Sequence, residues 1–379
     1  MNAVRTRVLR AAAAAGLAVV VALLAVGVWS YRAWTTGPRA TPGSAAVSVR
    51  VDPGATVAAV ADTLGARGLL RHPRIFRWGA RLTGQDRDLR AGLYELPPDA
   101  SPRRLLAIMT AGQTVPVVIT LPEGIEVRDA AARLSGLLGF EADTFLAAAD
   151  SLAASELRRR GWIAPAAAAR LDSLAAVSAG APGPRRFHWS EGYLAPDTYH
   201  FAEGSTAREV ARTLLSLQLA RLDSALAVRP ADGELPPLTP HDLVTLGSIV
   251  EAESRRSDER ARVAAVYANR LRDGWKLDAD PTVAYFLAKR GQRLLHVDLA
   301  RTSPYNTYRT AGLPPGPIGN PGLPALLAAA RPDTTCRAYF FVSDGDGGHV
   351  FSRTWEEHSA AVKAYRQRRD RRDEAGGAR

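Results

Sequence analysis

The sequence has 379 residues, of which 46% are hydrophobic and 23% are charged. A chain of this length and composition can bury more than one hydrophobic core, which excludes disorder over most of the chain and favours one or two domains with appendages. Lysine and arginine number 49 and acidic residues 38, so the net charge of +11 suits a polyanionic partner such as nucleic acid, anionic lipid or a cell-wall polymer, without distinguishing among them. The single cysteine, Cys336, excludes an intramolecular disulfide and any metal site built from several cysteines.

The N-terminus predicts a membrane anchor. Three arginines within residues 1–10 precede an uncharged run over residues 11–31, and a helix of that length spans the hydrocarbon core of a bilayer, about 30 Å. A cleaved signal peptide is the alternative, but its apolar region is usually only about 7 to 15 residues long, and Trp29 and Trp34 are typical of a membrane interface. The charge asymmetry then places residues 1–10 in the cytoplasm and everything after the linker 32–46 outside the inner membrane, in a single-pass protein.

Residues 47–115 predict a small mixed unit. Val47 and Val49 begin an alternation of apolar and polar residues that is typical of a strand. Ser101 and Pro102 have the residue types of a helix N-cap and a first helical position. We expect helices at about 57–64, 74–82 and 102–112, and a second strand at 89–96.

The second predicted domain covers residues 116–365. It begins with a strand at 117–121 and a helix from about residue 127. The segment 143–186 is rich in alanine and interrupted by prolines, and we expect a solvated helical insertion there. Residues 366–379 form a basic C-terminal tail. The predicted fold class is therefore α+β, with an N-terminal transmembrane helix, a small module and a larger mixed α/β domain.

A helix over residues 243–254 carries two candidate catalytic acids. Residues 239–242 (TPHD) supply an N-cap threonine, a proline at the first helical position and an acid at the third. At about 100° per residue, Glu253 falls roughly 50° from the centre of the apolar face and Glu251 roughly 110° from it. An acid on the apolar side must be paired, protonated or functional, because burial disfavours its charged form and raises its pKa. A general acid requires such a raised pKa.

The ordinary alternative is that both acids lie in solvent and form ion pairs near the end of the helix. Glutamate is common at helix ends, so helical phase alone favours this alternative. The available partners are Arg255, Arg256 and Arg262.

The segments that follow favour a groove for a sugar chain. A second amphipathic helix at 262–271 leads to a short connection, 277–282, that holds two acids. Residues 303–308 (SPYNTY) bring aromatic rings beside amide and hydroxyl groups, which together suit a sugar ring. The residues at 312–322 (GLPPGPIGNPG) predict a rigid loop that can shape a groove. Ordinary turn chemistry is an equally good interpretation of these segments.

Seven motifs in one order give the sequence a family resemblance. They are EGYLAPDTY at 191–199, SIVEAES at 248–254, NRL at 269–271, DPTV at 280–283, SPYNTY at 303–308, GLPPGPIGNPG at 312–322 and GGHVF at 347–351. Together they resemble the YceG-like (MltG) family of endolytic murein transglycosylases over roughly residues 45–365. The resemblance implies a LysM-like module at 47–115 and a transglycosylase domain at 116–365. It implies cleavage of the MurNAc-β-1,4-GlcNAc bond in nascent peptidoglycan strands, which leaves 1,6-anhydro-MurNAc ends and terminates elongation.

The resemblance also assigns site residues. It places the essential acid at Glu253, in agreement with the helical phase. The supporting or substrate-binding candidates are Glu251, Glu191, Asn269, Asp280, Thr282, Tyr305, Asn306 and Tyr308. Two positions depart from the pattern: Asp278 stands where an amide is expected, and Ala195 where an aromatic residue is usual. The implied partners are glycan strands, the inner membrane and peptidoglycan synthases, with no cofactor, no metal and no nucleic acid.

Other classes of function fit the sequence less well. A non-catalytic scaffold that binds peptidoglycan is the main alternative, and it would need no acid at residue 253. The sequence has no Ser-x-x-Lys or Gly-x-Ser-x-Gly pattern for a serine hydrolase. His349 and His358 are nine residues apart without the acid motif of a zinc site. None of the three lysines stands in a motif for a Schiff base with pyridoxal phosphate.

Overall fold

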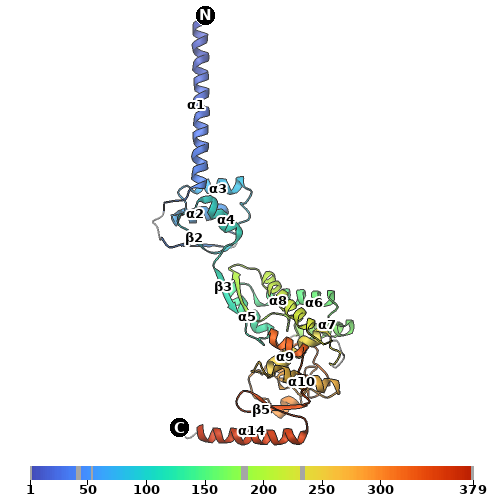
Figure 1. Ribbon diagram of the computed structural model, residues 1–379. Coiled ribbons are helices and arrows are strands. Elements are labelled where there is room, and N and C mark those ends of the chain that lie inside the picture. Colours follow the sequence, from blue (N-terminus) through green and yellow to red (C-terminus); the bar gives the residue numbers. More distant parts are fainter. Residues whose placement is uncertain (1, 40–43, 53, 181–186, 231–234, 377–379) are drawn as a thin grey trace. The chain divides into compact units, whose positions relative to one another are not determined.

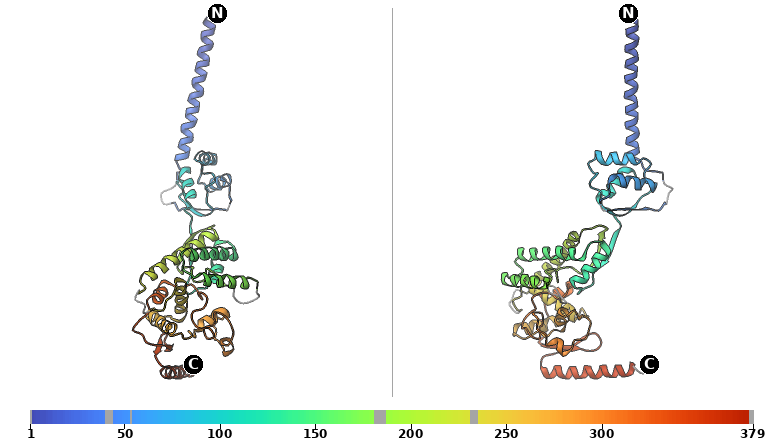
Figure 2. Two further views of the ribbon diagram at one scale, coloured as in Figure 1. Left: turned by 90° about the vertical axis from the view of Figure 1, so that its right-hand side faces the viewer. Right: turned by 180° about the vertical axis from the view of Figure 1, so that it is seen from behind.

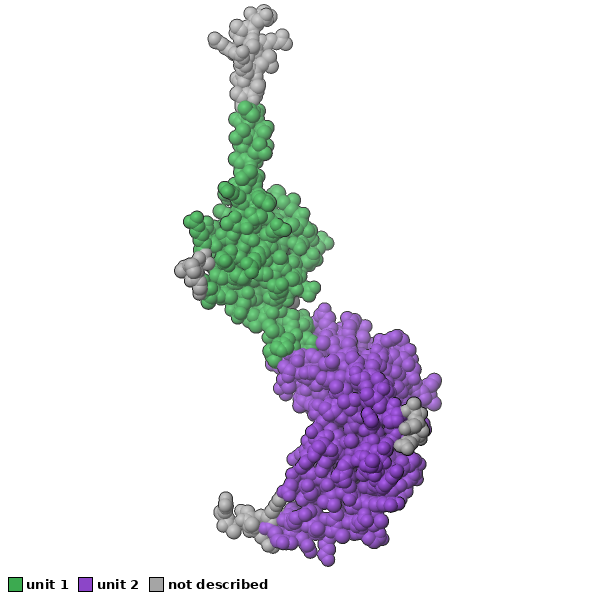
Figure 3. Space-filling view, viewed as in Figure 1, with its two compact units in different colours: residues 1–118, 200–205 green, residues 119–199, 206–379 purple. Residues whose placement is uncertain are grey.

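The computed structural model describes residues 2–39, 44–52, 54–180, 187–230 and 235–376. The chain divides into two compact units (Figure 3), which are unit 1, Met1–Val118 with His200–Ser205, and unit 2, Ile119–Tyr199 with Thr206–Arg379. Three parts of the predicted features lie outside the described residues: 40–43 of the linker, 181–186 of the alanine-rich segment and 377–379 of the tail.

The N-terminal helix α1 runs over Asn2–Thr35 (Figure 1). Its part Ala15–Thr35 has a mean hydropathy of 1.7 and is not buried against the rest of the protein. Within the described residues it is the one helix long and apolar enough to cross a membrane. The apolar run at 11–31 thus forms a helix, as predicted, and its exposed apolar side chains need an environment other than water.

Unit 1 packs three helices on a two-stranded sheet. The elements are β1 (Val47–Val51), α2 (Val57–Ala66), α3 (Pro73–Leu82), β2 (Gly92–Leu96) and α4 (Pro102–Ala111). The two strands are antiparallel with Val49 opposite Tyr94. The hydroxyl of Ser101 accepts the N–H of Arg104 and caps α4, as the sequence predicts. The predicted strands and helices of this unit are confirmed.

Unit 2 is mainly helical, with a hairpin near its C-terminal end. Its helices are α5 (Val127–Leu138), α6 (Ala142–Arg159), α7 (Pro165–Gly180), α8 (Ala207–Ala227), α9 (Pro240–Glu253), α10 (Arg260–Arg272), α11 (Asp280–Phe286), α12 (His296–Leu299), α13 (Leu323–Ala330) and α14 (Trp355–Gly376). The strands β5 (Phe340–Ser343) and β6 (His349–Ser352) form an antiparallel hairpin. A further pair, β3 (Pro116–Thr120) and β4 (Thr198–Ala202), forms a two-stranded sheet. The fold is thus mixed α/β.

Helix α9 lies at the centre of unit 2. Thr239 and Asp242 form the predicted capping box at its start, with Pro240 in the first turn. The side chains of Leu246 and Ile249 are fully buried, and α9 packs against α13, α10 and α8. Since its whole apolar face is covered, the position of each polar side chain on this helix is fixed by the surrounding helices.

The first part of the alanine-rich segment, α6, is not the solvated helix that the sequence suggested, whereas most described residues of α7 are exposed or half-buried. Helix α6 packs against both α5 and α8 and buries Phe145, Ala149, Ala153 and Leu157. These four residues recur every four positions, which places them on one face of a helix. The prediction was wrong because the surrounding alanines hide this period, although their small side chains are what allow α6 to approach its neighbours closely.

The loop before β4 is attached to the glycine- and proline-rich loop at 312–322. The Gln218 amide, buried on α8, donates to the carbonyls of Gly192 (3.0 Å) and Pro321 (2.9 Å). Asn320 accepts the N–H of Leu194 at 2.8 Å. Gly192 has a φ of +85°, and an added Cβ would lie 2.5 Å from Pro317. Only glycine satisfies both the backbone angle and the close approach.

We expect Gly192→Ala to destabilise unit 2 by at least about 1 kcal/mol, because it adds steric overlap to a left-handed backbone angle. The matched control is Gly136→Ala, an exposed position inside α5 where an added Cβ meets nothing within 4 Å. Its expected effect is a gain of about 0.5–1 kcal/mol from helix propensity. Thermal unfolding of both variants measures the difference, and equal melting temperatures would contradict this account of the loop.

Candidate active site

A pocket of about 380 Å³ opens in unit 2 at the C-terminal end of α9. The residues that line it are Glu126, Ala252, Glu253, Asp280, Pro281, Ala284, Tyr285, Arg290, Gly291, Gln292, Arg293, Leu294 and Ile318. They come from the end of α9, the helix α11 and the connection after it, together with Ile318 of the 312–322 loop and Glu126, the residue before α5. The predicted catalytic acid Glu253 and the candidate Asp280 therefore face the same cavity.

Glu253 is the last residue of α9, and its carboxyl group contacts the helix that follows. The Tyr267 hydroxyl on α10 donates to Glu253 Oε1 at 2.8 Å. Tyr267 itself is 2% exposed, so its ring and hydroxyl are held by packing. One oxygen of Glu253 is thus fixed by the protein while the residue lines the pocket.

The environment of Glu253 raises its pKa from 4.5 to about 7. Burial is the main cause, and the negative charge of Asp280 adds to it; the Tyr267 hydrogen bond and the positive charge of Arg270 act in the opposite direction. The end of α9 also carries the negative pole of the helix, which disfavours a second negative charge there. At neutral pH, Glu253 is therefore present in both protonation states.

Glu251 has a different environment two residues earlier. Its side chain is 6% exposed and forms an ion pair of 2.7 Å with Arg260. Its second oxygen accepts the N–H of Gly322 at 3.0 Å. Burial raises the pKa of Glu251, against the Gly322 and Arg260 contacts. Glu251 thus attaches the 312–322 loop to α9.

The alternative in which both acids lie in solvent is wrong. Glu251 is buried with Arg260, and Glu253 binds a tyrosine hydroxyl. Arg256, one of the expected partners, instead pairs with Asp258 at 2.7 Å. The alternative failed because both acids meet side chains of α10, Arg260 and Tyr267, at the end of the helix.

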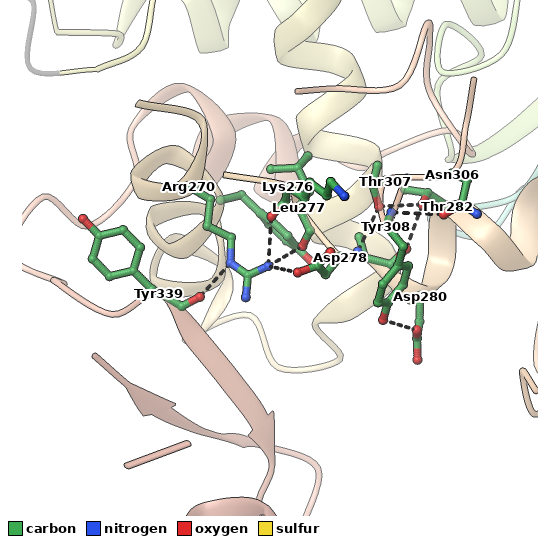
Figure 4. A network of polar contacts seen from close by, with 12 residues as sticks. Arg270, Lys276, Leu277, Asp278, Asp280, Thr282, Asn306, Thr307, Tyr308 and Tyr339 are labelled. Atoms are coloured by element: carbon green, nitrogen blue, oxygen red, sulfur yellow. Dashed lines mark hydrogen bonds and ion pairs between the residues drawn. The ribbon is translucent and has the colours of Figure 1, made fainter. Parts of the chain in front are cut away.

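Arg270 holds the connection that leads to Asp280 (Figure 4). Its guanidinium group donates to the carbonyl of Tyr339 at 2.7 Å and to the carbonyl of Leu277 at 2.8 Å, and it contacts the Asp278 carboxylate at 3.2 Å. Asp278 has a φ of +47°, a left-handed angle that Asp and Asn tolerate better than most residues. The departure at Asp278 from the expected amide therefore still suits the backbone.

The 303–308 segment is bonded to the start of α11 (Figure 4). Tyr308 donates its hydroxyl to Asp280 Oδ1 at 2.7 Å. Thr307 Oγ1 lies 2.9 Å from Thr282 Oγ1. Asn306 accepts the N–H of Tyr308 at 3.0 Å, and its amide group donates to the carbonyls of Leu299 and Arg301 just before the segment. Thr282 and Asn306 are fully buried, so they shape the wall behind Asp280.

The structure places the remaining candidates away from the cavity surface. Glu191 is 2% exposed; it accepts the N–H of Val127 at the start of α5 and the hydroxyl of Tyr285. Asn269 donates to two carbonyls beyond α13. Tyr305 is buried against Tyr285, with ring centres 5.2 Å apart. Ala195, also fully buried, accepts the hydroxyl of Tyr199 through its carbonyl.

Sequence reasoning missed the polar residues on the opposite side of the pocket. Arg290, Gln292 and Arg293 line it from the connection between α11 and α12. Their only signal was the sequence Arg-Gly-Gln-Arg directly after a short helix. Tyr267 lies in the predicted amphipathic helix at 262–271, but no local pattern reveals that its hydroxyl meets Glu253.

Within the part of the chain that the structure describes, no three His, Cys, Asp or Glu side chains are grouped to hold a metal ion. His349 contacts Glu259 at 2.9 Å, and His358 stacks on Phe340. The pocket itself offers one group able to give and take a proton near neutral pH, Glu253, beside two further acids, Glu126 and Asp280, and two arginines. This set suits general acid and base catalysis on a polar substrate.

Comparisons with known proteins identify the family of this chain. Residues 49–364 match the YceG-like family. The chain is 28% identical over 321 residues to the endolytic murein transglycosylase of Bacillus subtilis strain 168, with 84% of each protein covered. It is 29% identical to the protein of the same name from Streptococcus pneumoniae strain R6, over 83% of this chain and 58% of that protein. A crystal structure of a yceG-like protein from Listeria monocytogenes matches 83% of this chain and 98% of its own, with 26% identity and a TM-score of 0.51.

The raised pKa of Glu253 predicts a stability difference that depends on pH. Unfolded Glu253 ionises near 4.5 and the folded residue near 7, so its contribution favours folding below pH 4.5 and is lost as pH rises through 7. Glu253→Gln removes a cost of at most about 3 kcal/mol, which builds up as pH rises from 4.5 to 7 and is fully present above pH 7.

Thermal unfolding at pH 5 and pH 8 measures this effect. We expect Glu253→Gln to raise the melting temperature of unit 2 relative to wild type more at pH 8 than at pH 5. The control is Glu95→Gln, a change at an exposed acid on β2. This variant should shift the melting temperature by the same amount at pH 5 and pH 8. The same shift at both pH values for Glu253→Gln would argue against a carboxyl group buried in its neutral form.

Proposed function

Because this chain belongs to the YceG-like family, we propose that it is a lytic transglycosylase that cuts peptidoglycan strands internally. Its named relatives are endolytic murein transglycosylases. The observation that carries the proposal is Glu253, a pocket carboxyl group with a pKa of about 7 that is held by a neutral hydroxyl. A single acid of this kind can serve both proton transfers of the reaction.

The reaction is an internal displacement without water. Protonated Glu253 gives its proton to the bridging oxygen as the bond between MurNAc C1 and that oxygen breaks, so GlcNAc leaves with a free hydroxyl group. The Glu253 carboxylate then takes the proton of the MurNAc C6 hydroxyl as O6 bonds to C1. The product is a 1,6-anhydro-MurNAc end, and Glu253 is again protonated.

This pathway explains why one catalytic carboxyl group is enough. Hydrolytic glycosidases use two carboxyl groups, the second as a base or nucleophile, but here the nucleophile belongs to the substrate. Asp280, the other candidate acid in the pocket, accepts the Tyr308 hydroxyl and raises the pKa of Glu253 through its charge. In this proposal, Asp280 also stabilises the positive charge that develops at C1.

The arginines of the pocket suit the anionic parts of a glycan strand. Muramoyl residues carry a carboxyl group on their lactyl ether or on the peptide attached to it. Arg290 and Arg293 line the pocket beside Gln292, and guanidinium groups bind carboxylates in a bidentate manner. We assign these three residues to substrate binding.

The other predicted supporting residues act through positioning in this proposal. Glu251 holds the 312–322 loop, and Tyr308 holds Asp280. The five buried candidates support the walls around the pocket through their contacts. They are Glu191, Asn269, Thr282, Tyr305 and Asn306.

The finer placement of the protein is also proposed. Residues 1–10 lie in the cytoplasm, α1 anchors the chain in the inner membrane, and the chain after the linker 32–46 lies outside it. The compact residues 47–115 act as a LysM-like module that binds glycan, and peptidoglycan synthases supply the nascent strands. A net charge of +11 suits the anionic polymer and lipid surface found there.

Glu253→Gln should reduce the formation of 1,6-anhydro ends by about 10² to 10⁴, because an amide cannot donate a proton as a carboxylic acid does. The assay incubates the full chain with purified peptidoglycan and detects anhydro ends by mass. Glu251→Gln is the control on the same helix: it keeps an acceptor for the Gly322 N–H and should retain cleavage, with an earlier thermal transition.

The same experiment separates the enzyme from the scaffold alternative. A scaffold would bind glycan equally well with Glu or Gln at residue 253 and would release no anhydro ends in either form. Wild-type turnover in the Glu253→Gln variant would reassign the acid to Glu251 or Asp280, and activity in variants of all three acids would reject the mechanism.

The anchor makes a separate prediction. We expect the protein to remain uncleaved and to fractionate with the inner membrane, with its C-terminus outside, because α1 is long enough to span a bilayer. Membrane fractionation and N-terminal sequencing measure this. A mature form that begins near Val28 in the soluble envelope fraction would instead identify α1 as a signal sequence.

A further inference from the structure

Helix α3 exposes apolar side chains in unit 1 without a protein partner among the described residues. Trp78 is 68% exposed and Leu82 80% exposed. With Ile75 they follow the i, i+3, i+7 spacing of one helical face. The opposite side of the helix, through Phe76 and Ala80, is fully buried in the core of unit 1. Helix α3 therefore has two apolar faces, and only one of them serves the fold.

The exposed face of α3 adjoins the C-terminal part of α1 within unit 1 (Figure 2). Gly79 approaches the Trp34 ring so closely that an added Cβ would overlap it, and the rings of Trp29 and His72 have centres 5.1 Å apart. The two helices border a groove of about 850 Å³. Its apolar lining includes Val26, Trp29, Trp34, Ile75, Trp78 and Leu82.

Basic side chains flank this apolar face. Arg74 and Arg81 are exposed on α3, and at about 100° per residue they lie on the side next to Trp78. Arg71 lies just before the helix and lines the same groove as Arg74. Apolar and aromatic residues on one side with arginines beside them are the pattern of a helix that lies in a membrane interface.

We propose that α3 inserts its face of Ile75, Trp78 and Leu82 into the outer surface of the membrane in which α1 is anchored. This inference rests on the proposed anchoring of α1. The groove between α1 and α3 takes lipid acyl chains, and Arg71, Arg74 and Arg81 contact the phosphates of the headgroups. The occupant is membrane lipid because the groove continues the apolar surface of α1 at the point where its aromatic residues leave the bilayer. Unit 1 is then held by two contacts with the membrane.

A fluorophore that responds to polarity tests this contact in the full chain. Leu82→Cys in a Cys336→Ser background is labelled and reconstituted into phosphatidylglycerol vesicles, with spin-labelled lipid as quencher. We expect a blue-shifted emission and strong quenching. The matched control is Glu95→Cys, exposed on β2 at the side of unit 1 away from the apolar part of α1 (Figure 1); its label should show the emission found in water and little quenching. Thermal unfolding of each labelled variant verifies its fold.

The outcomes separate this inference from the proposed function. A chain that does not float with vesicles at all refutes the anchor itself. A chain that floats while its label at residue 82 remains in water refutes only the docking of α3. A label shielded from both water and lipid quencher, with disulfide-linked dimers of the unlabelled Leu82→Cys variant, would assign this face to a second copy of the chain and overturn the proposal. Arg74→Gln with Arg81→Gln should weaken the quenching if headgroup contacts hold the helix.

Discussion

Burial of α9 as far as Val250 constrains the rest of unit 2, because every polar group on a buried helix needs a partner. Ser248 accepts the N–H of Ile318 at 3.0 Å, and Glu251 accepts that of Gly322 at 3.0 Å. Both bonds attach the loop at 312–322, and Ile318 lines the pocket. The loop that limits the cavity thus takes its position from the helix that carries the acid.

The two glutamates on this helix have different partners, and these partners give them different chemical roles. Burial raises the pKa of both. Glu251 meets the charged Arg260 and a backbone N–H, which stabilise its ionised form and make it a structural contact. Glu253 meets the neutral hydroxyl of Tyr267. One such bond does not offset desolvation, so the proton remains available near neutral pH.

Sequence patterns predicted the features that depend on local periodicity. The capping residues located the start of α9, and the alternation of valines located β1. The phase of α9 put Glu253 nearer the apolar face than Glu251, but phase alone still favoured acids in solvent, and the family resemblance was needed to select Glu253. The features that the sequence did not predict depend on the surface against which a residue packs, and local patterns do not reveal that surface. The packing of α6 on α8 depends on alanines that look alike in sequence, and the contact between Tyr267 and Glu253 joins residues on separate helices. Arg290 and Arg293 enter the pocket only because the connection after α11 folds back beside α9.

The attachments of α9 at both ends also restrict how this segment can vary. The capping box at Thr239 and the 2.8 Å bond between His241 and Tyr193 fix its start, while Arg260 and Tyr267 receive the two acids at its end. One inserted or deleted residue between these points would rotate everything beyond it by about 100°. Glu251 would leave Arg260 at the same time as Glu253 left the pocket. Neighbouring side chains can adjust to a substitution along α9, but they cannot adjust to a change in its length. The number of residues in α9 is therefore a requirement of the active site.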